Sequence, residues 1–132
     1  MASTTFSGPV TSTNGFIGAT TGNVTGNVTG DLTGRVIGTV GARSGAGAVP
    51  ITAATVRLTT TGANALTLAN GTEGQLLTII TVAAAGTATL TPATRLGFST
   101  IAFSAVGHAT TLQYFTTQGW MIVSNYGSTV NP

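Results

Sequence analysis

The chain has 132 residues and a formal net charge of +2, and only 5% of its residues are charged, against roughly a quarter in ordinary soluble domains. A positive mean hydropathy of +0.41 argues against intrinsic disorder. The absence of cysteine excludes a disulfide framework and a thiolate metal site. No apolar run approaches the roughly 18 residues of a membrane span, and so few basic residues give too weak a field for binding nucleic acid through its phosphates.

The low charge also bears on whether the protein is a monomer or part of an assembly. A soluble monomer usually keeps a charged surface, which prevents association, so a neutral surface rich in threonine and glycine indicates a component of an assembly. The alternative is a neutral β-protein that its hydroxyl groups keep soluble. The first residues, MASTTFSGPV, lack a basic segment and a long apolar run, and we therefore expect no signal peptide.

Residues 1–17 carry a few apolar residues among serine, threonine, glycine and proline. They predict a short arm without a core of its own. After the arm, a four-residue repeat begins: glycine recurs at every fourth position from Gly18 to Gly38, and an aliphatic residue at every fourth position from Val24 to Val40. Four is twice the period of a strand, so both series lie on one face of an extended chain and mostly polar residues lie on the other. A helix is disfavoured, because each glycine would cost it about 1 kcal/mol.

A single ribbon of this kind would leave its backbone groups unpaired, so it needs partners with the same pattern. Further copies of the same chain are the simplest partners, since the glycines let backbones approach and the aliphatic residues fill the axis between them. Residues 18–50 therefore predict an intertwined trimeric β stem followed by a junction. A path that turns at each glycine and a flexible linker are the alternatives. The predicted trimer interface comprises Gly22, Val24, Gly26, Val28, Gly30, Leu32, Gly34, Val36, Gly38 and Val40.

The junction is placed at residues 41–50, GARSGAGAVP, which are small and rich in breakers. Residues 51–132 predict an all-β domain. Its short segments are rich in β-branched and aromatic residues and are separated by turn signals, which favours a small β-sandwich of jelly-roll or related type. No segment shows helical periodicity. The predicted strands are Ala54–Thr60, Ala65–Ala69, Gln75–Ala83, Thr87–Thr91, Thr100–Ser104, Ala109–Phe115 and Trp120–Asn125.

The inward positions of these strands predict the core of the sandwich. An aromatic sugar platform formed by Tyr114, Trp120 and Tyr126 is the alternative use of those residues. The predicted core comprises Val56, Leu58, Leu66, Leu68, Leu77, Ile79, Leu90, Ile101, Phe103, Leu112, Tyr114, Trp120 and Ile122.

Groups for catalysis are scarce in this sequence. An enzyme needs a positioned acid, base or nucleophile, and the chain has one histidine, two carboxylate side chains and no cysteine. We therefore expect no catalytic residue, no metal and no cofactor. His108 is predicted to be a turn or interface residue, Glu73 to serve its own Asn-Gly turn, and Asp31 to lie near Arg35.

Two parts of the chain resemble known proteins. The segments TFSGPVTSTNGF and GNVTGNVTGDLTG resemble stretches common in structural proteins of tailed bacteriophages, notably fibres and capsid-decorating proteins. The segments GTEGQLLTIITVAAAGTATLTP and TIAFSAVGHATTLQYFTTQGWMIVSNYG resemble a small trimeric β-domain of such proteins, through Gly-Gln-x-Leu, Thr-Leu-Thr-Pro and Gly-Trp-x-Ile. The resemblance covers most of the chain and implies a homotrimer without catalysis.

Within that group, the length favours a capsid decoration (cement) protein, because 132 residues hold one short stem and one head, whereas a fibre needs an adaptor, a shaft and a tip. The expected role is a trimer on the outside of the virion that binds the major capsid protein between capsomers and stabilises the phage head. No nucleic acid or membrane partner is expected. Alternatives are a short tail fibre or knob that binds a receptor or glycan, and a non-viral ligand-binding β-domain.

The arm is the predicted attachment to the capsid, since an apolar arm without its own core docks elsewhere. The opposite polarity, with the sandwich on the capsid, stays open. The residues assigned to capsid binding are Phe6, Val10, Phe16 and Ile17.

Overall fold

The computed structural model describes residues 35–132. The predicted arm, with Phe6, Val10, Phe16 and Ile17, and the repeat as far as Gly34 lie outside the described residues. Residues 35–132 contain ten strands and no helix. The strands are β1 (Val40–Ser44), β2 (Gly47–Ala48), β3 (Thr55–Thr59), β4 (Asn64–Leu68), β5 (Leu76–Ala83), β6 (Ala88–Pro92), β7 (Thr100–Phe103), β8 (Ala109–Phe115), β9 (Gly119–Tyr126) and β10 (Thr129–Asn131).

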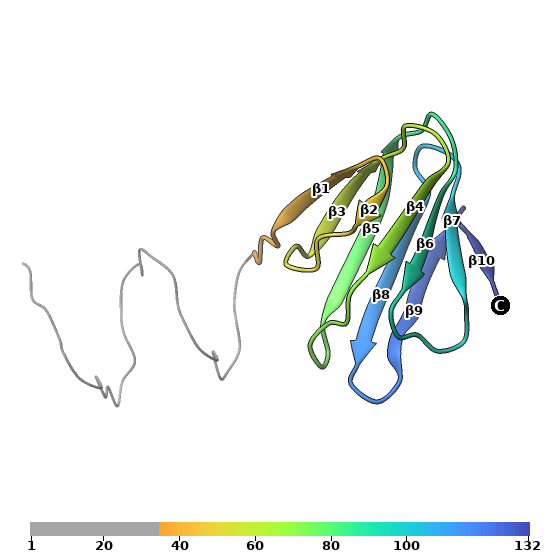
Figure 1. Cartoon of the computed structure of the whole chain (residues 1–132). Helices are drawn as coiled ribbons and strands as arrows, with labels where there is room; N and C mark the ends of the chain where they lie inside the picture. Colours follow the sequence, from red (N-terminus) through yellow and green to blue (C-terminus); the bar gives the residue numbers. More distant parts are fainter. Residues whose placement is uncertain (1–34) are drawn as a thin grey trace, which may run out of the picture. The chain divides into compact units, whose positions relative to one another are not determined.

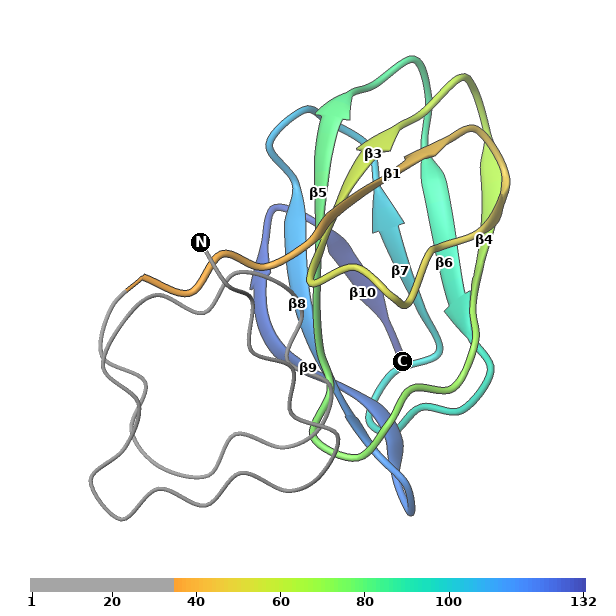
Figure 2. The ribbon, with the colours of Figure 1, turned by 90° about the vertical axis from the view of Figure 1, so that its left-hand side faces the viewer.

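The strands form two mixed sheets of five that face each other in a sandwich-like arrangement (Figures 1 and 2). Sheet A has the order β1-β3-β5-β8-β9, and sheet B has the order β10-β7-β6-β4-β2. The all-β expectation is confirmed.

The first six strands alternate between the sheets. In sheet A, β1, β3 and β5 pair in parallel, and in sheet B, β2, β4 and β6 do the same. Each pair of consecutive strands is thus one coil of a short solenoid, and the coils stack side by side. From β7 onward the neighbouring strands pair antiparallel. The jelly-roll expectation is therefore wrong for the first six strands, because a jelly roll is built from antiparallel Greek keys.

Each of the seven predicted strands is present, as β3 to β9, with ends within one residue of those expected. Strands β1 and β2 were missed, and they lie at the end of the repeat and in the segment predicted to be a junction. Strand β10 was missed as well. These short, small-residue segments are strands because they extend sheets that longer strands already form, a tertiary effect that local propensity does not contain.

The core lies between the sheets. Every predicted core residue is buried except Ile122, which is partly buried and packs against the others. The structure adds Val49, Ala53, Ala88 and Phe98 to the core.

The positions of Tyr114 and Trp120 decide whether these aromatic residues belong to the core or to a sugar platform. Trp120 is fully buried, and its indole nitrogen donates a hydrogen bond to the Ala69 carbonyl at 2.9 Å. The ring of Tyr114 meets it edge-on at 5.2 Å. These two rings are therefore core residues, and a sugar platform would have only Tyr126 exposed.

One threonine ties two coils together at a corner. Thr60 follows β3 and is 2% exposed. Its hydroxyl donates to the Gly86 carbonyl at 2.7 Å and accepts from the amides of Ala85 and Gly86 at 2.9 and 3.2 Å. The turn after β3 is thereby fastened to the turn after β5. Thr81, on β5, is 1% exposed, but its hydroxyl has no hydrogen-bond partner.

These two threonines give a matched test. Thr60→Val should lower the free energy of unfolding by about 2–3 kcal/mol, because it removes the three hydrogen bonds that the buried Thr60 hydroxyl makes to Ala85 and Gly86. Thr81→Val keeps the shape and removes an unpaired buried hydroxyl, so it should be neutral or stabilising. Urea unfolding at one protein concentration measures both. Equal losses in the two variants would contradict the role given to Thr60.

Candidate functional site

The acidic side chain and the histidine of the described residues lie apart from each other. Glu73 is in the β4–β5 loop and His108 in the β7–β8 turn. Leu76 pairs with Gln113 and Ile80 with Ala109, so these two loops lie at opposite ends of the sandwich. Among residues 35–132 there is no group of three His, Cys, Asp or Glu residues that could hold a metal ion.

Glu73 acts as an acceptor for a neighbouring turn. Its Oε2 accepts a hydrogen bond from the Thr116 amide at 2.7 Å. That bond, helped by the Thr116 hydroxyl, lowers the pKa of Glu73. The Asn-Gly turn before it is served instead by Gln75, whose Oε1 accepts from the Thr72 amide at 2.9 Å. The expected role of Glu73 in its own turn is thus wrong: the carboxylate joins the β4–β5 loop to the β8–β9 turn.

His108 has a structural environment. It is half-buried, and its Nδ1 accepts a hydrogen bond from the Ser104 amide at 3.4 Å, across the β7–β8 turn. Its ring lies against Gly127, where an added Cβ would come within 2.6 Å of the imidazole Cδ2. These contacts agree with the prediction of a turn residue.

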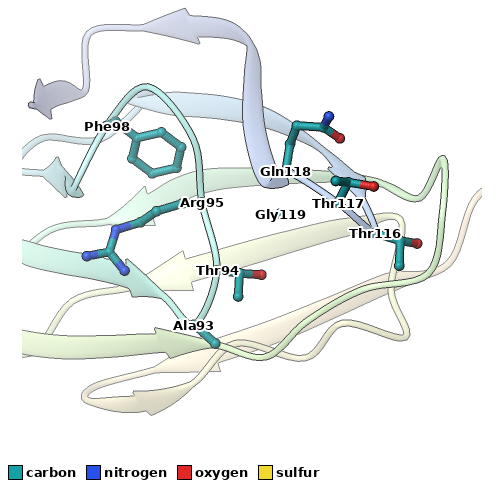
Figure 3. A pocket seen from close by; sticks show the side chains of 8 residues that line it. All are labelled: Ala93, Thr94, Arg95, Phe98, Thr116, Thr117, Gln118 and Gly119. Atoms are coloured by element: carbon teal, nitrogen blue, oxygen red, sulfur yellow. The ribbon is translucent and has the colours of Figure 1, made fainter.

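A hollow of about 510 Å³ opens between the β6–β7 loop and the β8–β9 turn (Figure 3). Hydroxyl and amide side chains dominate its rim, and the ring of Phe98, which is 7% exposed, is part of its lining. The guanidinium of Arg95 points away from Gln118 in Figure 3, and its Nη1 donates to the Pro92 carbonyl at 2.6 Å. The lining residues are Ala93, Thr94, Arg95, Phe98, Thr116, Thr117, Gln118 and Gly119.

The walls of this hollow are fixed by the backbone. The Trp120 amide donates to the Thr94 carbonyl at 3.0 Å, and the Leu96 amide donates to the Trp120 carbonyl at 3.1 Å. Gly119 makes this approach possible, because its φ is +80° and an added Cβ would lie 2.4 Å from the Thr94 carbonyl carbon. The hollow can hydrogen-bond to a polar ligand surface, and its side chains include no acid to pair with a base.

The outer face of sheet A is the second candidate. Of the exposed large apolar residues, Val40, Leu76, Val82, Val123 and Tyr126 belong to its strands. The sequence carried a signal for this surface. Strand β5 reads LLTIITVA, so aliphatic residues occupy both of its faces, although only the inward ones were assigned a role.

Three of the predicted trimer-interface residues are within the described part of the chain. Val36 and Val40 are exposed in the single chain. Gly38 is close to its own domain, because a Cβ added there would come within 2.8 Å of the Ala54 Cβ. The prediction of a trimer interface at these residues stays a prediction.

The hollow yields a test of its backbone constraint. Gly119→Ala should lower the free energy of unfolding by about 1–3 kcal/mol more than Gly97→Ala, because overpacking adds to the strain of a positive φ. Gly97 is the matched control: its φ is +86° and an added Cβ there meets nothing within 4 Å. Chemical unfolding of both variants measures the difference. Equal losses would show that φ alone accounts for Gly119.

The Glu73 contact makes stability depend on pH. A pKa lowered from the ordinary value of 4.5 means that the contact stabilises the folded state above about pH 4.5. This stabilisation is lost as the pH falls through the lowered pKa. The wild type should therefore exceed Glu73→Gln in unfolding free energy at pH 7, and the difference should shrink by pH 3. A difference that does not change between these pH values would contradict the contact.

Comparisons with known proteins assign no family. No protein family model matches the chain, and no curated protein matches it. Within residues 35–132, no helix is long and apolar enough to cross a membrane.

Proposed function

We propose that this chain is a non-enzymatic structural protein of a phage virion: a homotrimeric capsid decoration protein on the outside of the head. It binds the major capsid protein between capsomers and stabilises the shell. The sequence resemblance to phage structural proteins supports this role. The observation that carries it is the outer side of sheet A, whose strands hold the exposed apolar residues Val40, Leu76, Val82, Val123 and Tyr126 and a single outward charge, Arg57. Such a face suits a protein that works within an assembly.

The proposed stabilisation of the shell follows from the surface area that the trimer buries. A trimer seated at a joint between capsomers buries surface there that would be exposed if the joint opened. A protein that binds the closed joint and not the open one stabilises the closed state. The stabilisation grows with the logarithm of the free concentration of that protein relative to its Kd. The predicted capsid contacts Phe6, Val10, Phe16 and Ile17 would supply apolar area to this joint.

A second function has one observation in its favour. The hollow beside Thr94 and Gln118 is lined by hydroxyl and amide groups at one end of the sandwich. Polar side chains that converge on an open site can hydrogen-bond to a sugar. A short tail fibre or knob that binds a receptor or glycan is therefore the alternative.

Copy number separates the two functions. In purified particles that carry this chain, its amount is measured against the major capsid protein by quantitative mass spectrometry. A decoration protein should be present at a ratio of order one, and particles stripped of it should release their contents at a lower temperature. A ratio of a few per cent would contradict decoration and favour the fibre.

A further inference from the structure

The outer face of sheet A can be defined from the strand register. The buried partner of Val56 in β3 is Ile79 in β5, and Gly41 in β1 also pairs with Val56, so their neighbours along each strand point outward. The hydroxyls of Thr78 and Thr111 lie 3.0 Å apart on this face. One cross-strand row of the face contains Ala42, Arg57, Ile80, Ala109 and Tyr126; a second contains Val40, Thr55, Thr78, Thr111 and Ser124; and a third contains Leu76, Gln113 and Met121.

The outer face of sheet B is the internal comparison, since it belongs to the same neutral domain. Its side chains are nearly all threonine and alanine. The large exposed aliphatic residue of this sheet, Val130, pairs with buried Ile101 and so lies on the inner side. The residues of this outer face are Ala48, Ala65, Thr67, Thr89, Thr91, Thr100, Ala102, Thr129 and Asn131.

The outer faces of the two sheets therefore differ in the size of the apolar side chains that they expose to water. On sheet A, Leu76 is 54% exposed, Val40 62% and Tyr126 75%. A contiguous exposed apolar surface marks an interaction site, whereas scattered apolar residues do not. In the first row of sheet A, Ile80, Ala109 and Tyr126 are neighbours across β5, β8 and β9 and form a continuous apolar run, whereas the outer face of sheet B presents small residues, nearly all threonine and alanine. This run identifies the outer side of sheet A as the covered face.

Charge indicates what covers it. Arg57 is the charged residue of the face, and Glu73, the acidic side chain of residues 35–132, lies in a loop away from it. Apart from a single acidic group that Arg57 could pair with, a charged partner would lose hydration on this surface without finding partners for its charges. A second copy brings an equally weakly charged surface, and because β3 is next to the edge strand β1, the long stem of Arg57 lets the like-charged guanidiniums of the two copies stay apart, in water at the rim. The face thus favours another copy of this chain.

The face is smaller than a standard interface on its own. Five strands about 4.8 Å apart, with five to eight residues each at about 3.3 Å per residue, give a width of about 24 Å and a length of about 20 Å, which is a plane of about 480 Å². Each partner contributes roughly 800 Å² to a stable interface, so the face needs the stem as a second contact.

The face also contains the last residue of the predicted trimer interface. Val40 is the last aliphatic residue of the four-residue series, and it lies in the second row of this face. Val40 is therefore on the outside of sheet A and not in the core of the sandwich.

We propose that copies of this chain associate through the outer face of sheet A, with Ile80 on its central strand at the middle of the contact. This inference rests on the proposed homotrimer and names the surface that its heads share. It adds a second interface to the one predicted for the stem.

The test uses two arginine substitutions in the full chain. Ile80→Arg changes the central strand of the sheet A face, and Thr89→Arg changes the central strand of the sheet B face; both positions are half-exposed in the single chain. Because the stem is expected to hold copies together as well, light scattering is measured over a dilution series: Thr89→Arg should dissociate as the wild type does, and Ile80→Arg should fall toward the 13.0 kDa of one chain at a protein concentration at least tenfold higher, with the near-ultraviolet signal of Trp120 retained. A wild-type dilution profile for Ile80→Arg would overturn the face and leave a trimer held by the stem alone.

A second measurement does not disturb the fold. The chain has no cysteine, so Ile80→Cys and Thr89→Cys each carry a single thiol. In the assembled protein, a maleimide should label the thiol at position 80 at least tenfold more slowly than that at position 89, and urea should remove the difference. Equal labelling rates in the assembled protein would overturn the inference, whereas a low copy number in the virion would overturn decoration and leave this interface standing.

Discussion

The parallel register between successive coils sets the position of most other contacts in this domain. Val56 lies beside Ile79 in sheet A, and Leu66 lies beside Leu90 in sheet B, so each coil places its aliphatic side chains next to those of the coil before it. Because the chain crosses from one sheet to the other at every coil, the two aliphatic stacks meet and form the core. The corner at Thr60 keeps the coils in this register, since its hydroxyl binds the turn of the next coil.

That register also determines what the outside of each sheet carries. In a strand, residues alternate between the two faces, so a strand of the solenoid presents one residue outward for each one buried. In β5 the outward residues include the aliphatic Leu76 and Ile80 with Thr78 between them, and in β6 they are threonines. The same alternation that places aliphatic residues in the core therefore also determines which residues each outer face presents. The difference between the two outer faces is the feature from which self-association is inferred.

Much of this fold could be predicted from local patterns. Alternation along Gln75–Ala83 and Ala109–Phe115 identified the strands and their inward residues, because burial of one face is a local property of a strand. The direction of pairing could not be predicted, since β1 beside β3 has the same alternation whether parallel or antiparallel. Strands β1, β2 and β10 depend on an existing sheet edge, and their small residues give no signal of their own.

The candidate sites were harder to predict than the core. The hollow is formed by loops of ordinary turn residues, and Phe98 reaches the core from the β6–β7 loop, outside any periodic pattern. The partner of Glu73, Thr116, lies 43 residues away in the sequence, so no local motif joins them. The apolar face of sheet A was legible in the double-sided aliphatic pattern of β5, but only the sheet shows which residues of β1, β8 and β9 lie beside it.

The solution mass of the full chain is the most direct measure of whether copies of this protein associate. Light scattering coupled to gel filtration, at micromolar concentration and physiological salt, measures it without assuming any interface. We predict a mass of about 39 kDa, three times the 13.0 kDa of one chain. A folded protein that stays at the mass of one chain as its concentration rises would contradict self-association, and with it both the trimeric stem and the shared face of sheet A.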